Sequence, residues 1–192
     1  MPKDSDVPSR RPMRADARRN VEKIVAAAGA LIAEHGADAS LEEVARRAGV
    51  GSATLHRHFP SRQVLLEAVF KDRVEVLCAK AGDLLTESDP GQALSTWLHA
   101  VGAHAAAHRG LGASLMQDGD PALGESCHDM ITTAGDALLS RAQAADLVRP
   151  GITITQLLKL VGAIALATEH DVDGRAEADL LLTIAIDGVR TR

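Results

Sequence analysis

"GVGSATLHRHFPSR" (residues 49–62) places two histidines, two arginines and three hydroxyl side chains in one short segment. Gly49 and Gly51 precede these polar residues, and Pro60 follows most of them. Glycine commonly ends a helix and proline cannot continue one, so the pattern predicts a turn and then a short helix capped by Ser52. Ser61 is placed to cap a longer helix after the proline. Most of these donors are therefore expected on a short helix between a glycine turn and a proline, as in an exposed binding element.

The residues before this segment predict two more helices. Apolar side chains recur with helical spacing from about Arg18 onward, and Gly36 is placed to end that helix. Ser40-Leu41-Glu42-Glu43 is a capping box, in which the serine accepts from the Glu43 amide and the glutamate side chain returns to the serine amide. A short helix follows and ends at Gly49. Two short helices joined by a glycine turn predict a helix-turn-helix whose second helix is held away from the body.

A helix of this kind fits the major groove of DNA, which is about 12 Å wide. Small side chains at the start of the helix allow close approach of the backbone, Thr54 offers a hydroxyl or a methyl group, and Arg57 suits a guanine or a phosphate. The histidines and the start of the next helix are expected to bind phosphates. The residues predicted to contact DNA are Arg18, Ser40, Gly51, Ser52, Ala53, Thr54, His56, Arg57, His58, Ser61 and Arg62.

The distribution of charge supports this location. The net charge is -5, yet residues 1–73 carry 13 Lys and Arg against 10 Asp and Glu, whereas residues 74–192 carry 8 against 16. Only the N-terminal part is basic, which favours nucleic acid at that end alone. Residues 1–17 are expected to form a flexible basic arm. Two cysteines without a CxxC motif, no signal peptide and no apolar run of about 18 residues predict a cytoplasmic protein without membrane contact.

The composition favours packed helices over sheets. The chain is 46% hydrophobic but only 2% aromatic, so alanine, leucine and valine must build the core. We expect an all-α fold with a helix-turn-helix domain over residues 18–63 and a helical domain over residues 64–192. The second domain should contain helices near 90–109, 110–117, 121–147, 153–168 and 175–190. No segment matches a strand better than a helix.

Residues 18–70 resemble the N-terminal domain of the tetracycline-repressor-like (TetR) transcriptional regulators. The resemblance is carried by Thr54, by Phe59 at the end of the recognition helix, and by Ser61 and Arg62 at the start of the next helix. His56 departs from the pattern, since the family usually has a phosphate-binding tyrosine there. The resemblance implies a C-terminal domain that dimerises and often holds a small-molecule pocket.

Several C-terminal residues are candidates for that pocket. Trp97 is the one large aromatic side chain beyond residue 73, and methionines adapt to varied apolar ligands, although all of these residues also suit an ordinary core. His104 and His108 have the i, i+4 spacing of metal ligands, with His99, Cys127 and His128 as further donors, but pocket lining or solvent exposure explains them better. No metal or cofactor is therefore predicted. The ligand-binding candidates are Trp97, His104, His108, Leu111, Leu115, Met116 and Met130.

The last two predicted helices are apolar around much of their circumference. They need more cover than one subunit's core supplies, unless both are fully buried within that subunit. A two-fold interface between copies would cover them and would set two recognition helices about one DNA turn, ~34–36 Å, apart on a palindromic operator. The predicted homodimer interface comprises Ile154, Leu157, Leu158, Val161, Leu166, Leu181 and Ile184.

These features together predict a dimeric, sequence-specific transcriptional regulator that binds double-stranded DNA and acts as a repressor released by a small-molecule effector. The alternative is a helical small-molecule-binding or metal-sensing protein with weak or no specific DNA binding. An enzyme is not expected, because the sequence contains no GxSxG, P-loop or HExxH motif, and the paired aspartates near residues 118–120 and 171–173 suit solvated turns.

Overall fold

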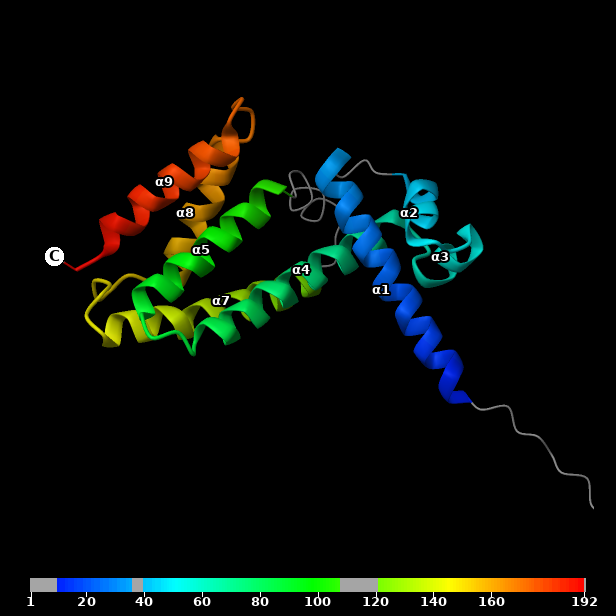
Figure 1. The fold of residues 1–192 in the computed structure, drawn as a ribbon, viewed down its shortest axis with the longest axis horizontal. Coiled ribbons are helices and arrows are strands. Elements are labelled where there is room, and N and C mark those ends of the chain that lie inside the picture. The colour runs from blue at the N-terminus through cyan, green and yellow to red at the C-terminus, as the bar shows by residue number, and fades with distance from the viewer. Residues whose placement is uncertain (1–9, 36–39, 108–120, 192) are drawn as a thin grey trace, which may run out of the picture.

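The computed structural model describes residues 10–35, 40–107 and 121–191, and these residues form eight helices and no strand. Three helices make the N-terminal domain: α1 (Arg10–His35), α2 (Leu41–Ala48) and α3 (Ser52–His58). The predicted all-α fold is confirmed. Figure 1 shows α2 and α3 at one end of the molecule and α8 and α9 at the other.

The turn between α2 and α3 follows from its local sequence. Gly49 adopts φ 67°, a left-handed conformation that favours glycine, and its N–H donates to the carbonyls of Ala45 and Arg46. The N-cap of α3 is Gly51 and not Ser52, which is the first helical residue. The helix ends at His58, two residues before Pro60, as predicted.

Half of the predicted capping box is present at the start of α2. The Ser40 hydroxyl accepts a hydrogen bond from the Glu43 amide at 3.4 Å. The Glu43 carboxylate, however, accepts from the Arg46 guanidinium at 2.8 Å. An i, i+3 ion pair within α2 thus engages the side chain that was expected to return to the Ser40 amide.

The first helix starts earlier than expected. It begins at Arg10, so the predicted arm does not extend to residue 17. Pro12 is no obstacle, because the first turn of a helix has no intrahelical acceptor for its N–H groups. Residues 1–9 and Gly36, where further parts of the prediction fall, lie outside the described residues.

The fourth helix, α4 (Arg62–Leu84), is shared by both domains. Ser61 caps it by accepting from the Val64 amide at 3.3 Å. Leu65 and Val69 pack into the N-terminal core, whereas Leu77 and Ala81 pack into the C-terminal one. The boundary between the two cores therefore lies within α4, and not between residues 63 and 64 as predicted.

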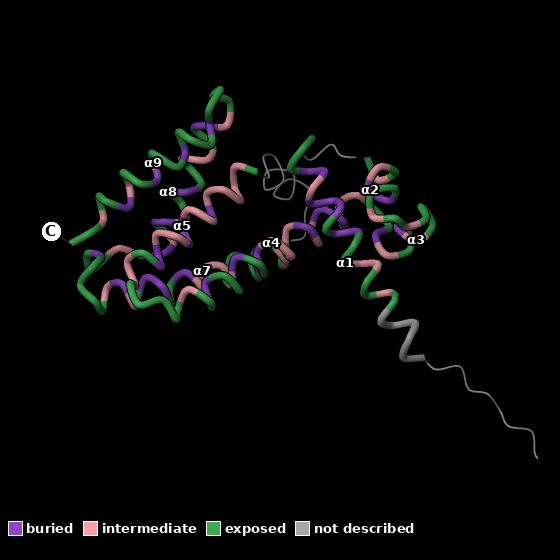
Figure 2. The backbone as a smooth tube through the Cα atoms, in the orientation of Figure 1, coloured by how far each residue is buried: buried purple, intermediate pink, exposed green. Residues whose placement is uncertain are grey.

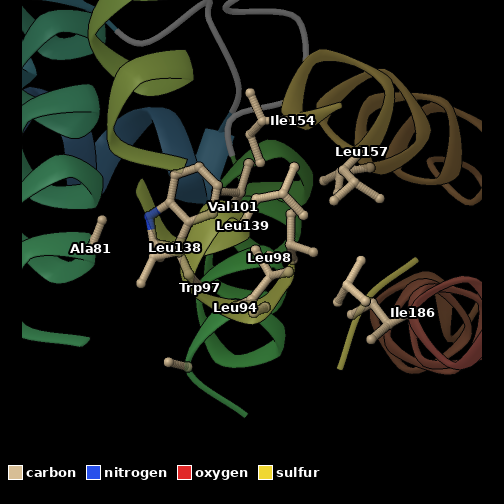
Figure 3. Packing of buried hydrophobic residues seen from close by; sticks show 14 of the residues in the cluster. Ala81, Leu94, Trp97, Leu98, Val101, Leu138, Leu139, Ile154, Leu157 and Ile186 are labelled. Atoms are coloured by element: carbon tan, nitrogen blue, oxygen red, sulfur yellow. The ribbon is translucent and has the colours of Figure 1, made fainter. Parts of the chain in front are cut away.

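The C-terminal domain contains α5 (Pro90–Ala107), α7 (Pro121–Ala144), α8 (Ile154–Ala167) and α9 (Gly174–Val189), close to the predicted ranges. The helix predicted near 110–117 lies outside the described residues. Trp97 is fully buried at the centre of this core, and its indole N–H donates to the Leu77 carbonyl at 2.9 Å (Figure 3). No helix in the described ranges combines the length and apolar character needed to cross a bilayer.

Candidate nucleic-acid interface

The second helix of the helix-turn-helix is anchored by one side and exposed on the other. Leu55 is buried in the N-terminal core together with Phe59, which follows the helix. Ser52, His56 and Arg57 are exposed (Figure 2 marks exposed residues of α3 in green). Packing of α3 on the core through its apolar side therefore presents its polar side chains to a partner.

All eleven residues predicted to contact DNA lie at least partly at the surface. Thr54, His58 and Arg62 are half-buried. The exposed ones are Arg18, Ser40, Gly51, Ser52, Ala53, His56, Arg57 and Ser61. The predicted contact residues between positions 51 and 62 lie together on α3 and at the start of α4.

Arg57 is the most available cation on α3. No hydrogen bond or ion pair joins it to another residue in the described part of the chain. By contrast, Arg46 and Arg47 on α2 are engaged by carboxylates. Arg57 can therefore direct its five N–H donors at a phosphate or a base without breaking a contact.

Two of the residues predicted to contact DNA have restricted donors. The Ser40 hydroxyl donates to the Glu42 carboxylate at 2.7 Å while accepting from the Glu43 amide. This bond lowers the pKa of the Glu42 carboxyl below its usual value. His58 has its Nε2 buried without a partner, so that nitrogen faces the protein and not an approaching phosphate.

A bidentate ion pair fixes α2 against the end of α1. Both terminal nitrogens of Arg47 donate to the Glu34 carboxylate, at 2.7 and 2.6 Å. These hydrogen bonds lower the pKa of the Glu34 carboxyl and raise the pKa of the Arg47 guanidinium. The pair contributes to the orientation of the helix-turn-helix on α1.

The C-terminal helices divide their apolar side chains between the core and the surface. Ile154, Leu157 and Val161 are buried within the subunit, so they are core residues and not interface residues. Leu166 is 71% exposed and Ile184 is 60% exposed. Leu158 and Leu181 are half-buried.

Two further apolar side chains, which the predicted interface does not include, lie at the surface of these helices. Leu160 on α8 is 39% exposed and Leu180 on α9 is 55% exposed. The i, i+4 spacing of Leu180 and Ile184 is the signal that could have found the second one, because it places both on one face of α9. We use the name surface leucine face for the exposed large apolar residues of α8 and α9 taken together, which are Leu160, Leu166, Leu180 and Ile184.

The predicted ligand-binding residues do not form one site within the described residues. Trp97 belongs to the core, which was the alternative interpretation. Met130 is half-buried beside Cys78 in an open hollow of about 690 Å³ between α4 and α7. His104 is half-buried on α5. The remaining candidates, His108, Leu111, Leu115 and Met116, lie outside the described residues.

The side chains considered as metal ligands are dispersed. His99 contacts the Ser95 carbonyl at 2.9 Å and the Thr183 hydroxyl at 3.3 Å. Cys127 is buried and His128 is exposed. Among the described residues, no three His, Cys, Asp or Glu side chains are grouped as a metal site requires. His108, the second member of the predicted pair, is not among those residues.

Comparisons with known proteins give a consistent result. Residues 24–69 match the model for bacterial regulatory proteins of the tetR family, and residues 89–191 match the C-terminal domain of SbtR-like transcriptional regulators. An HTH-type transcriptional regulator of Staphylococcus aureus is 32% identical over 83 residues, which are 42% of this chain and 43% of that protein. The chain thus matches less than half the length of this relative.

Two solved structures match over nearly their whole length. A TetR transcriptional regulator of Streptomyces coelicolor is 37% identical, with a TM-score of 0.75 over 88% of this chain and 98% of that one. A TetR regulatory protein of Mycobacterium vanbaalenii is 31% identical, with a TM-score of 0.72 over 94% and 100%. Both domains and their arrangement are therefore similar to those of known regulators.

Proposed function

The chain belongs to the TetR family of bacterial transcriptional regulators, and from this premise we propose that it is a homodimeric repressor released from a palindromic operator by a small molecule. It is a DNA-binding regulator with a helix-turn-helix domain. The observation that carries the proposal is α3, which is anchored through Leu55 and exposes Arg57, a side chain with no partner among the described residues. Because a bacterial regulator of this family acts on DNA inside the cell, we propose that the protein lies in the bacterial cytoplasm.

In the proposed complex, α3 enters the major groove with its N-terminal residues toward the bases. Gly51, Ser52 and Ala53 lack large side chains, which allows the backbone to approach closely. Thr54 contacts a phosphate or a thymine methyl group, and Arg57 contacts a guanine or a phosphate. Base contacts select the sequence, whereas phosphate contacts set the position of the helix.

Phosphates are proposed to bind around this helix. The N-terminus of α4 follows directly after α3, and the amides of its first turn favour an anion. Ser61 and Arg62 lie at this terminus. Arg18 on α1 pairs with Glu22 at 3.0 Å, but both side chains are largely exposed, so a phosphate can replace the carboxylate at small cost.

Dimerisation is proposed to occur through the surface leucine face of α8 and α9. Exposed large apolar side chains on adjacent helices favour burial against a second copy. A two-fold axis there would repeat the recognition helix at a fixed distance, as a palindromic operator requires.

Release by a ligand is proposed to act through α4. The first turns of this helix belong to the N-terminal core and its last turns to the C-terminal core. A ligand that favours one arrangement of the C-terminal domain would therefore alter the spacing of the two recognition helices. A ligand that binds tightly but leaves operator affinity unchanged would refute this mechanism.

The Arg57→Ala variant tests the role of α3. Loss of a bidentate contact to a base should weaken operator binding by about 1–3 kcal/mol, or roughly 5- to 150-fold. Gel shifts at one stated salt concentration measure the change, and thermal unfolding should be unaltered because Arg57 is exposed. Arg190→Ala, which removes an exposed arginine from the far domain, is the matched control. Equal binding by both variants would remove Arg57 from the interface.

A further inference from the structure

A cleft lies where the two domains meet. It has a volume of about 450 Å³ and is bounded by the end of α1, the end of α5 and the start of α9. Figure 1 shows the last turn of α5 and the first turn of α9 directed toward the end of α1. The volume is within the range of small-molecule sites, about 300–1,000 Å³. The cleft is distinct from the hollow beside Met130, which lies between α4 and α7.

The walls of the cleft are mostly apolar. Ile32 and Ala33 contribute from α1, and Ala103 and Ala107 contribute from α5. Small side chains leave room for a ligand body, and apolar ones favour its removal from water. An adjoining slot between α5, α8 and α9 has a volume of only about 10 Å³, so it takes no more than a water molecule in this conformation. The ligand body must therefore occupy the cleft itself.

Among the described residues, two charged side chains line the cleft, and one of these two lacks a partner. The Glu34 carboxylate accepts both hydrogen bonds from Arg47, which compensates its charge. Arg175, the second residue of α9, makes no hydrogen bond or ion pair with any other residue of the described ranges. Asp171, Asp173 and Asp179 line a neighbouring hollow together with Arg175, but none of them lines the cleft. Among the described residues that line the cleft, the charge without an ion-pair partner is therefore positive.

We propose that this cleft binds a small organic anion, a carboxylate with a short apolar body, held by Arg175 between the two domains. A guanidinium matches a carboxylate through two parallel hydrogen bonds. The positive end of the α9 dipole adds to the attraction, since Arg175 lies in the first turn of that helix. The apolar body lies against the alanines of α5 and the end of α1.

A ligand in the cleft would lie beside a contact that connects α1 to the helix-turn-helix. Glu34 lines the cleft and also binds Arg47 on α2, so the ligand lies beside the ion pair that joins α2 to α1. A ligand that contacts both α1 and α9 would favour one relative arrangement of the two domains. This regulatory consequence rests on the proposed function, whereas binding at the cleft does not.

Calorimetric titration of the full-length protein with octanoate tests the site without DNA. We expect saturable binding with one site per chain. Octan-1-ol, which has the same apolar body without the charge, should bind at least tenfold more weakly, because hydrogen bonds between charged groups account for about that factor. Absence of saturable octanoate binding, or equal binding of the alcohol, would overturn the proposal.

Two variants locate the binding. Arg175→Gln should weaken octanoate binding at least tenfold, whereas Arg190→Gln, an exposed arginine at the other end of α9, should leave it unchanged. Ala107→Phe should also abolish binding by filling the cleft from an exposed position, and an unchanged melting temperature would show that it folds. Octanoate that binds Arg175→Gln as it binds the wild type would refute the assignment. A third outcome is that both variants lose octanoate binding while octanoate leaves the operator affinity of the wild type unaltered. That result would establish the site and refute only its regulatory role.

Discussion

Replacement of both Leu166 and Ile184 with glutamate should convert the proposed dimer to monomers. Full burial of a leucine or isoleucine side chain contributes about 1.5–3 kcal/mol. With 71% and 60% of these residues exposed, burial of the exposed part contributes about 1–2 kcal/mol for each. Two-fold symmetry repeats both side chains, so the four together contribute about 4–8 kcal/mol, or roughly three to six orders of magnitude in the dissociation constant.

Sedimentation equilibrium at micromolar concentration measures this effect directly. The double variant should sediment as a folded monomer and should lose high-affinity binding to a palindromic operator. Val76→Glu is the matched control, because Val76 is 54% exposed on α4, away from the surface leucine face. A double variant that remains dimeric, or a control that dissociates equally, would refute the assignment of the dimer interface to α8 and α9.

Three other substitutions or treatments test the structure itself. Gly135→Ala should lower the free energy of unfolding by about 1–3 kcal/mol in a urea titration, because the new methyl group would lie 2.5 Å from a buried indole ring, whereas Gly124→Ala on the same helix meets nothing within 4 Å and should be neutral or stabilising; equal effects would refute the packing. Glu34→Gln should destabilise the protein at pH 7, since the bond from Arg47 lowers the pKa of this carboxyl, and the difference from wild type should shrink as the pH falls below the ordinary value of 4.5; a difference independent of pH would exclude the ion pair as its cause. Cys127 is buried and its thiol pKa is raised by desolvation, so iodoacetamide should leave it unmodified in the native protein and should modify it in urea; rapid native modification would contradict its burial.

The helix-turn-helix could be predicted from sequence because its signals act over a few residues. Gly49 takes a left-handed conformation that favours glycine, and Pro60 limits the helix before it. Ser40 and Ser61 each accept from the amide three residues later. None of these contacts depends on a distant part of the chain. The N-cap of α3 is Gly51 where Ser52 was predicted, a difference of one residue within this local pattern.

The proposed dimer face could not be predicted from sequence in the same way. The helix from residue 154 is apolar around most of its circumference, so its sequence does not show which side meets the core. Packing against Trp97 and its neighbours decides this, and it turns Leu157 and Val161 inward while Leu166 remains outside. The orientation depends on α5, and its Trp97 lies more than 50 positions before the start of α8.

The cleft between the two domains could not be predicted from sequence patterns either. Its arginine is residue 175, whereas its apolar walls come from the ends of α1 and α5. Residues so far apart have no shared spacing that would associate them. His58 is a second case in which the fold decides. Its imidazole donor favours a phosphate contact, but the fold directs Nε2 inward.

Selection of binding sites from a random duplex pool, confirmed by gel shift with the enriched sequence, tests whether α3 recognises a specific DNA sequence. We expect a palindrome whose half-sites are about 10 base pairs apart from centre to centre and which is bound by one dimer, and we expect mutation of either half-site to abolish binding. Absence of enrichment by protein shown to be folded and dimeric would contradict the assignment of α3 as a sequence-specific recognition helix.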